Sequence, residues 1–187
     1  MAKLCDGRVV IVTGAGRGIG REHALMLAAH GAKVVVNDLG GSRDGTGASK
    51  GPAEEVVHEI QAAGGTAAPN GDNVADFAGA GRMVKQALDT FGRLDAVVNN
   101  AGILRDRMLV NMAEAEWDAV IAVHLKGTFA LSHFAAAHWR DRAKAGERPN
   151  ARIVNTTSVS GLYGNPGQTN YGAAKAGIAA FTIIAAP

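Results

Sequence analysis

The chain has 187 residues, 47% of them hydrophobic and 19% charged, which excludes a disordered or fibrous protein and allows one globular domain. Its formal net charge is only +2, and scattered lysines and arginines give no basic patch of the kind that binds nucleic acid. One cysteine, Cys5, allows no intrachain disulfide and is compatible with a cytoplasmic protein, and the apolar runs 9–12 and 178–186 are too short for a signal peptide or a membrane span.

Five short runs rich in β-branched residues are predicted to be strands: 9–13, 33–38, 66–69, 94–99 and 152–157. Most are continuously apolar, which is typical of strands that are covered on both faces. Segments of helical composition lie between and after them: 19–30, 53–63, 77–91, 113 to about 140, and 171 to about 185. The alternation predicts an α/β fold with a doubly wound parallel sheet, in which ligands bind beyond the carboxyl ends of the strands.

Two connections are unusually long. Residues 39–51 contain five glycines together with Arg43, Asp44 and Lys50. This segment is either a tolerated surface insertion or the lid or rim of a site. Residues 141–150 are charged and contain Pro149, and we expect a solvated turn there.

The first strand ends in the sequence TGAGRGIG, residues 13–20, and a predicted helix follows at once. Glycines at such a turn let the backbone approach a pyrophosphate, and the helix N-terminus offers free N–H groups to it. We therefore predict a dinucleotide site. Its candidate residues in this turn are Gly14, Arg17, Gly18, Ile19 and Gly20.

Asp38 ends the second predicted strand, where a carboxylate can accept hydrogen bonds from the adenosine ribose hydroxyls. It would also repel a 2′-phosphate, which favours NAD as the cofactor. Arg17 acts in the opposite direction because a guanidinium can pair with that phosphate, so NADP stays possible.

Polar or small residues also follow the third and fourth strands. Asp72 can hold the adenine amino group, although an aspartate at such a place is equally typical of a helix cap. Ala101 and Gly102 are small enough to let a cofactor pass over the sheet.

The fifth strand is followed by Ser158, and Tyr171 comes thirteen residues later. Tyr171 and Lys175 are four residues apart and lie on one face of a predicted helix. An ammonium about 5 Å away stabilises a phenolate by ~3 kcal/mol at an effective dielectric near 20, so the pair can work as a base. The same spacing also occurs by chance in amphipathic helices.

Taken together, TGAGRGIG (13–20), NNAG (99–102), Ser158 and YGAAK (171–175) resemble the short-chain dehydrogenase/reductase family over essentially the whole chain. Four further stretches resemble the (3R)-hydroxyacyl-CoA dehydrogenase portion of peroxisomal multifunctional enzymes type 2 and their bacterial relatives. These are VVVNDLGG (34–41), NNAGILRDR (99–107), VHLKGTF (123–129) and GLYGNPGQTNY (161–171).

The resemblance implies a role for each matched residue. Tyr171 would be the general base in oxidation and the acid in reduction, and Lys175 would assist it while binding the nicotinamide ribose. Ser158 would hydrogen-bond the substrate oxygen. The residues expected to line the coenzyme are Gly14, Arg17, Ile19, Asp38, Asp72, Val74, Asn99 and Ala101.

One departure from the family pattern is His124, which stands where many members carry an asparagine that holds a water in the proton relay. His124 either bridges the same relay or is a satisfied helix residue. His133 and His138 are five residues apart and poorly aligned on a helix, so we expect no metal site.

The resemblance implies an oxidoreductase that transfers a hydride between NAD(H) and a 3-hydroxyacyl-CoA or a related ketone. The alternatives are an NADPH-dependent 3-oxoacyl-carrier-protein reductase, a hydroxysteroid dehydrogenase, or a catalytically silent nucleotide-binding regulatory protein. Silent members usually lack the Tyr or the Lys, and both are present here.

The resemblance further implies a homo-oligomer, a dimer or a tetramer, without a nucleic-acid or membrane partner. It also implies more strands and a substrate-covering segment after residue 187. We therefore expect residues 1–187 to be a single dinucleotide-binding domain that is incomplete at its C-terminus and poorly active alone.

Overall fold

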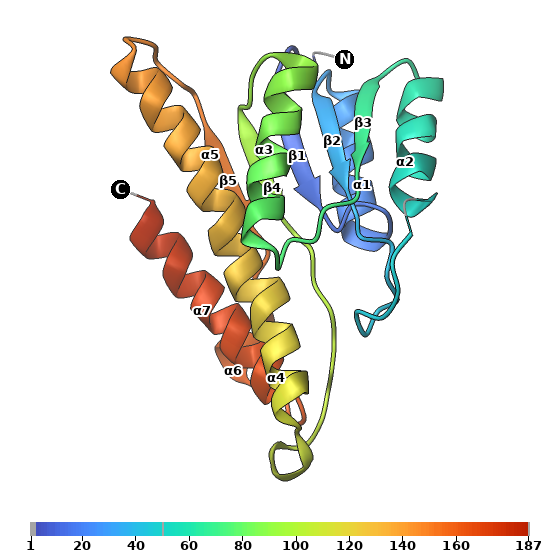
Figure 1. Ribbon diagram of the computed structural model, residues 1–187, viewed down its shortest axis with the longest axis vertical. Helices are drawn as coiled ribbons and strands as arrows, with labels where there is room; N and C mark the ends of the chain where they lie inside the picture. Colours follow the sequence, from blue (N-terminus) through green and yellow to red (C-terminus); the bar gives the residue numbers. More distant parts are fainter. Residues whose placement is uncertain (1–2, 50, 187) are drawn as a thin grey trace.

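The computed structural model describes residues 3–49 and 51–186, and it contains a five-stranded parallel sheet with helices on both faces (Figure 1). Its elements in chain order are β1 (Val9–Thr13), α1 (Gly18–Ala29), β2 (Lys33–Asn37), α2 (Gly51–Ala62), β3 (Thr66–Asn70), α3 (Phe77–Phe91), β4 (Ala96–Asn99), η1 (Leu109–Asn111), α4 (Glu114–Ile121), η2 (Ala122–Lys126), α5 (Gly127–Lys144), β5 (Arg152–Asn155), α6 (Val159–Tyr163) and α7 (Thr169–Ala185). The predicted doubly wound α/β fold is confirmed. Lys50 and Pro187, at the end of the predicted loop and of the chain, lie outside the described residues.

The strand order is β3-β2-β1-β4-β5, and every adjacent pair is parallel. Alternate residues of β1 face opposite sides of the sheet. Val9 and Ile11 pack with apolar residues of α3 and α5, whereas Val10 and Val12 pack with those of α1 and α2. Two cores on one sheet explain why the central strands are continuously apolar.

The adjacent strands β1 and β4 are followed by connections that lie on opposite faces of the sheet. The chain leaves β1 into α1, which packs in the core on one face of the sheet, and it leaves β4 toward α4 and α5, of which α5 packs in the core on the other face. The two connections diverge at the carboxyl ends of β1 and β4. An open crevice at this point is the usual ligand site of a doubly wound sheet.

Several features differ from the sequence prediction. Helix α5 continues to Lys144, so the solvated turn expected at residues 141–150 begins later; arginine and lysine are good helix formers and suit a helix C-terminus. The helix predicted from residue 113 contains a π-helical turn, η2. The short helices η1 and α6 were not predicted, because three and five residues are too few to show a helical period.

The helical stretch Glu114–Lys144 meets the length and hydropathy of a membrane span, with a mean hydropathy of 1.3 in its most apolar window. Within that window 44% of the residues are buried inside the protein, and α5 packs against α3 and β4 while α4 packs against α7. These contacts account for the buried apolar residues of the stretch as core residues of this fold.

Candidate active site

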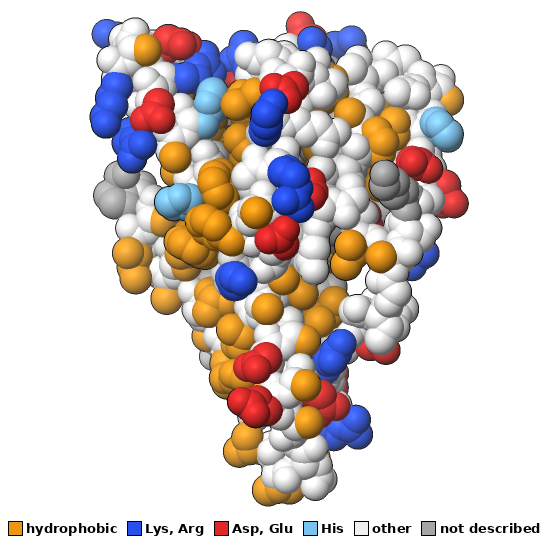
Figure 2. All heavy atoms as spheres, viewed as in Figure 1, with side chains coloured by type: hydrophobic (Ala, Val, Ile, Leu, Met, Phe, Trp, Pro, Cys, Tyr) orange, Lys and Arg blue, Asp and Glu red, His pale blue; other side chains and the backbone are white. Residues whose placement is uncertain are grey.

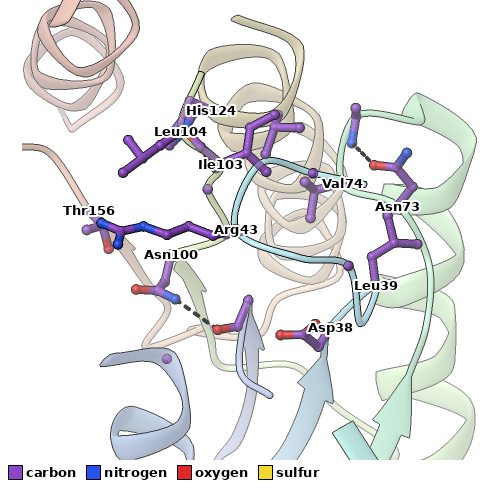
Figure 3. Close-up of a pocket in the computed structure, with 18 of the residues that line it drawn as sticks. Asp38, Leu39, Arg43, Asn73, Val74, Asn100, Ile103, Leu104, His124 and Thr156 are labelled. Carbon is purple, nitrogen blue, oxygen red and sulfur yellow. Dashed lines mark hydrogen bonds between the residues drawn. The ribbon is translucent and has the colours of Figure 1, made fainter. Parts of the chain in front are cut away.

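A cleft of about 790 Å³ lies beyond the carboxyl ends of the strands, at the divergence of β1 and β4 (Figure 3). It is lined by residues from the turn after β1, the loop after β2, the segments after β3 and β4, and the helices η2 and α7. The predicted site residues that line it are Gly14, Arg17, Gly18, Ile19, Gly20, Asp38, Asp72, Val74, Ala101, Gly102, His124, Tyr171 and Lys175. Residues as far apart in the sequence as Gly14 and Lys175 therefore share one cavity.

The turn after β1 is built for close backbone approach. Gly14 has a φ of +62°, and a Cβ on it would lie 2.7 Å from the Cα of Ala101. A Cβ on Gly20 would lie 2.1 Å from the carbonyl oxygen of Gly14. Arg17, the N-cap of α1, makes no side-chain capping hydrogen bond, so the first N–H groups of the helix stay available for an anion.

Asp38 stands at the far end of the cleft, just after β2. One carboxylate oxygen accepts from the N–H of Gly16 at 2.8 Å and the other from the N–H of Gly40 at 2.6 Å. Each oxygen keeps acceptor capacity, because an ionised carboxylate has about four lone-pair sites. The carboxylate is thus fixed by the turn that surrounds it and can still accept from ribose hydroxyls.

Asp72 is not a helix cap. Asp76 caps α3 and accepts from the N–H groups of Ala78 and Gly79, so the helix-cap interpretation of Asp72 is wrong. Asp72 instead pairs with Arg82 at 2.7 Å and keeps its place on the wall of the cleft.

The two asparagines after β4 have different positions. Asn100 lines the cleft, and its side-chain amide donates to the carbonyl oxygens of Thr13 and Gly14, which ties β4 to the turn after β1. Asn99 is buried beneath the cleft, where its amide donates to Ser132 and Asn155. Asn99 therefore supports the sheet ends that carry the site and is not among the residues that line the cleft.

Tyr171 and Lys175 meet at the opposite end of the cleft from Asp38. The Lys175 ammonium is 5.6 Å from the centre of the Tyr171 ring and donates to the carbonyl oxygen of Thr156 at 2.5 Å. Only 3% of Lys175 is exposed, and this burial lowers its pKa to about 8. The ammonium therefore keeps its charge near neutral pH while lying beside the phenol.

His124 lies against Tyr171 in a perpendicular ring arrangement, with the ring centres 5.2 Å apart. The π-helical turn places it inside, where 3% of the residue is exposed. Its Nε2 atom is hydrogen-bonded to the backbone of Ile103, and its buried Nδ1 atom has no partner in the described part of the chain. Burial lowers the pKa of His124 to about 4, and the Lys175 charge adds to this effect, so the imidazole is neutral at pH 7.

Ser158 lies on the loop between β5 and α6 and is the N-cap of α6. Its hydroxyl oxygen accepts from the N–H of Ser160 at 3.2 Å. Ser158 is not among the residues that line the cleft, although Thr156 of the same loop is, and α6 packs directly against α7. The loop therefore approaches the Tyr171 end of the cleft from the side.

Sequence reasoning missed several residues that line the cleft. They are Asn37, Leu39, Arg43, Asn73, Asn100, Ile103, Leu104, Arg105 and Thr156. Most belong to connections that follow strands, and the glycine-rich segment after β2 was left between two interpretations. Its placement on the cleft favours the interpretation as a rim or lid.

The arrangement fits a nicotinamide dinucleotide. The cradle at Gly14 and Gly20 has no room for a Cβ, the N-terminus of α1 is free of side-chain caps, and Asp38 offers acceptors at one end. The buried Nδ1 atom of His124 supplies an unpaired polar group at the other end. Fold and cleft together define a dinucleotide-binding α/β protein with a tyrosine–lysine pair.

Comparison with known proteins gives the family. The family model described as short chain dehydrogenase matches residues 8–186, and the chain belongs to this family. The crystal structure of a short chain dehydrogenase from Mycobacterium avium superimposes with a TM-score of 0.93 at 59% identity and covers 98% of this chain.

Two curated relatives carry more specific names. The hydroxyacyl-CoA dehydrogenase ChsB1 of Mycobacterium tuberculosis is 50% identical over an alignment of 187 positions that covers 97% of this chain. The peroxisomal multifunctional enzyme type 2 of Drosophila melanogaster is 50% identical over 173 residues, which cover 92% of it. The chain spans 56% of the length of the former, 27% of the latter and 63% of the Mycobacterium avium structure.

Proposed function

We propose that the protein transfers a hydride between NAD(H) and a 3-hydroxyacyl-CoA or its 3-oxo counterpart. The observation that carries the proposal is the buried Lys175 ammonium beside Tyr171 at one end of a cleft whose other end fits a dinucleotide. The substrate class is supported by the hydroxyacyl-CoA dehydrogenase and multifunctional-enzyme names of the relatives.

Different residues of the cleft would bind different parts of the coenzyme. The turn from Gly14 to Gly20 and the N-terminus of α1 would hold the pyrophosphate, and Asp38 the adenosine ribose. Lys175 would hold the nicotinamide ribose. When bound, the nicotinamide supplies the group that accepts or delivers the hydride.

The protein's own groups handle the proton. In the oxidative direction Tyr171 removes the proton of the substrate hydroxyl, and in reduction it returns that proton to the oxygen. The charge of Lys175 lowers the free energy needed to ionise Tyr171 to a phenolate, and the carbonyl oxygen of Thr156 accepts a hydrogen bond that holds the ammonium in place. A water on the unpaired Nδ1 atom of neutral His124 would continue the relay. Ser158 would donate to the substrate oxygen from the α6 side.

NAD is the proposed coenzyme because the Asp38 carboxylate stands where a 2′-phosphate would have to lie, and two like charges at contact distance repel by up to about 4 kcal/mol in a partly screened site. Arg17 also lines the cleft, and its guanidinium favours the second candidate, an NADPH-dependent 3-oxoacyl reductase. The two candidates differ in coenzyme rather than in the proton chemistry.

The test is a coenzyme and substrate panel on the full-length protein. We expect NADH formation from a (3R)-hydroxyacyl-CoA with NAD and at least tenfold slower turnover with NADP. Tyr171→Phe should lower kcat by 10²-fold or more, because general acid–base catalysis contributes about 10²–10⁴-fold. Tyr163→Phe, which removes the hydroxyl of an exposed tyrosine on α6, is the matched control. Turnover of a steroid or an acyl-carrier-protein substrate with no acyl-CoA activity would contradict the proposal.

A further inference from the structure

The segment of residues 39–49, which we call the strap, crosses the mouth of the cleft. It begins beyond the carboxyl end of β2 and reaches the segment after β4 (Figure 1). There the N–H of Leu104 donates to the carbonyl oxygen of Arg43 at 3.0 Å. The side chain of Arg105 donates to the carbonyl oxygen of Asp44 at 2.9 Å. Gly45 lies so close to Ile103 that an added Cβ would be 3.1 Å from its side chain.

The tip of the strap is a closed turn rather than a loose loop. One oxygen of the Asp44 carboxylate accepts from the hydroxyl of Ser42 at 2.7 Å and from the N–H and hydroxyl of Thr46 at 3.0 and 2.8 Å. These hydrogen bonds lower the pKa of Asp44 to about 2, so the carboxylate keeps them at every ordinary pH. Arg43 stands between Ser42 and Asp44, and its backbone is therefore fixed by the turn.

The side chain of Arg43 extends from the strap into the cleft, toward the wall formed by Asn100 and Thr156 (Figure 3). Within residues 3–49 and 51–186 no carboxylate pairs with it. Arg21, Arg82 and Arg107 form salt bridges at 2.5–3.0 Å, whereas Arg17 and Arg105, which also line the cleft, form none within the described residues. Arg43 thus presents a guanidinium, without a salt bridge among the described residues, to a cavity that the N-terminus of α1 also lines.

The N-terminus of α1 also carries a partial positive charge, because the side chain of its N-cap residue does not cap it. A ligand that contacts both this helix end and Arg43 is favoured if it carries negative charge. We infer that Arg43 binds the pyrophosphate of the dinucleotide from the solvent side and that the strap covers the bound phosphates. The inference rests on the proposed coenzyme site and adds a second, side-chain contact to the backbone cradle. A guanidinium suits this role because it donates to phosphate oxygens in pairs.

The test uses calorimetry on the full-length protein with three probes: NAD, ADP-ribose and adenosine. ADP-ribose keeps the pyrophosphate and loses the nicotinamide, and adenosine has no phosphate. We expect Arg43→Gln to weaken NAD and ADP-ribose binding about tenfold, the usual effect of losing a hydrogen bond to a charged group, and to leave adenosine affinity unchanged. Arg43→Lys should recover part of the affinity. Arg140→Gln, the same charge change on an exposed residue of α5, should alter none of the three.

Four outcomes would overturn the inference. Unchanged ADP-ribose affinity in Arg43→Gln would remove the phosphate contact. An equal loss for adenosine would show that the substitution disturbs the strap instead. An increased KM for acyl-CoA with unchanged ADP-ribose binding would assign Arg43 to the phosphates of the substrate. If the wild-type protein binds none of NAD, NADP and ADP-ribose, the proposed function is overturned together with the inference.

Discussion

Lys175 and His124 are two buried basic groups beside one phenol, and burial lowers the pKa of both, to about 8 and about 4 respectively. At neutral pH the first remains charged and the second is neutral. Tyr171 therefore meets a cation on one side and an uncharged ring on the other. In the proposed mechanism, this asymmetry would leave the electrostatic support of a phenolate to Lys175 alone and would make His124 a hydrogen-bonding residue.

The neutral His124 makes the stability of the protein depend on pH. Its pKa is about 4 in the folded protein and 6.5 in an ordinary setting, so the unfolded chain binds the proton more readily between these values. The contribution of neutral His124 to the free energy of unfolding is fully present above about pH 6.5. It is lost as the pH drops toward 4, and the loss amounts to about 3 kcal/mol in total. Urea unfolding at a series of pH values in this window measures the loss.

The matched variants for this experiment are His124→Gln and His58→Gln. The first removes the buried imidazole, and we expect the pH dependence between 6.5 and 4 to become smaller by a similar amount. The second removes an exposed histidine on α2 and should leave the dependence as it is. An unaltered pH dependence in His124→Gln would show that other groups carry it.

At this scale the sequence indicated most of the cleft, because glycines at a strand end and a Tyr–Lys spacing of four are local patterns. What it did not indicate were groups brought in by tertiary packing. Arg43 reaches the cleft only because the strap bonds to residues 103–105, and Asn99 is turned beneath the cleft by Ser132 and Asn155. Neither contact leaves a periodic signal in the chain.

At the scale of elements, the turn after β1 and the first turn of α1 act as one unit. Gly20 belongs to the helix, yet its Cα packs on the carbonyl oxygen of Gly14 and beside the amide of Asn100. Three elements, β1, α1 and the end of β4, converge there, with the side-chain amide of Asn100 between them. The packing of the turn and the phosphate binding proposed for it thus both depend on the absence of a side chain at Gly20.

Gly20→Ala should destabilise the protein by about 1–3 kcal/mol or more, since the new Cβ would lie 2.1 Å from one oxygen and 2.4 Å from a nitrogen, with backbone on one side. Gly51→Ala is the matched control, because the nearest atom to its Cβ would be the Ser49 hydroxyl at 3.5 Å. We expect the control to be neutral or slightly stabilising. Chemical denaturation of both variants measures the difference, and equal stabilities would contradict the packing argument.

The element boundaries were predicted to within a few residues wherever a long apolar period existed, as in α3, which spans Phe77–Phe91 in both prediction and structure. Helix α6 is a counterexample. Its five residues follow a strand that ends two residues earlier than predicted, and Ser158 caps it. A helix this short depends on its cap and on packing against α7, which sequence periodicity does not report.

At the scale of the whole molecule, β5 stands at one edge of the sheet, and its residues are less buried than those of β1. Val154 is 51% exposed, and Ile183 and Ile184 of the adjacent α7 are 78% and 77% exposed. Figure 1 shows β5 and α7 on the same side of the molecule, and Figure 2 shows further hydrophobic side chains gathered over the outer face of the helices. An exposed apolar edge strand is a site for pairing with another chain.

A protein that consists of residues 1–187 should therefore associate as its concentration rises. We expect Val154→Lys to reduce this association, because a charge on an edge strand opposes edge-to-edge pairing, while the fold is kept. Val110→Lys, on the 90% exposed residue of η1, is the control away from this edge. Light scattering over a concentration series measures the mass, and identical behaviour of the two variants would exclude β5 as the contact.

The overall fold could be predicted because alternating apolar strands and helices allow few other arrangements. The position of the cleft followed from the same rule. The order of the strands and the contact of the strap with the segment after β4 could not, since both depend on contacts between segments that are distant in sequence.

The π-helical turn at Ala122–Lys126 has a mechanical consequence for the long helix that contains it. A π turn holds one residue more than an α turn, so every side chain after it is rotated by about 100° relative to an uninterrupted helix. This offset lets α4 present its apolar residues to α7 while α5 presents its own to α3 and β4. The continuous helix formed by α4, η2 and α5 thereby connects α7, which carries Tyr171, to the sheet, which carries the glycine-rich turn after β1. Deleting a single residue in this helix would turn His124 and one of these two faces away together.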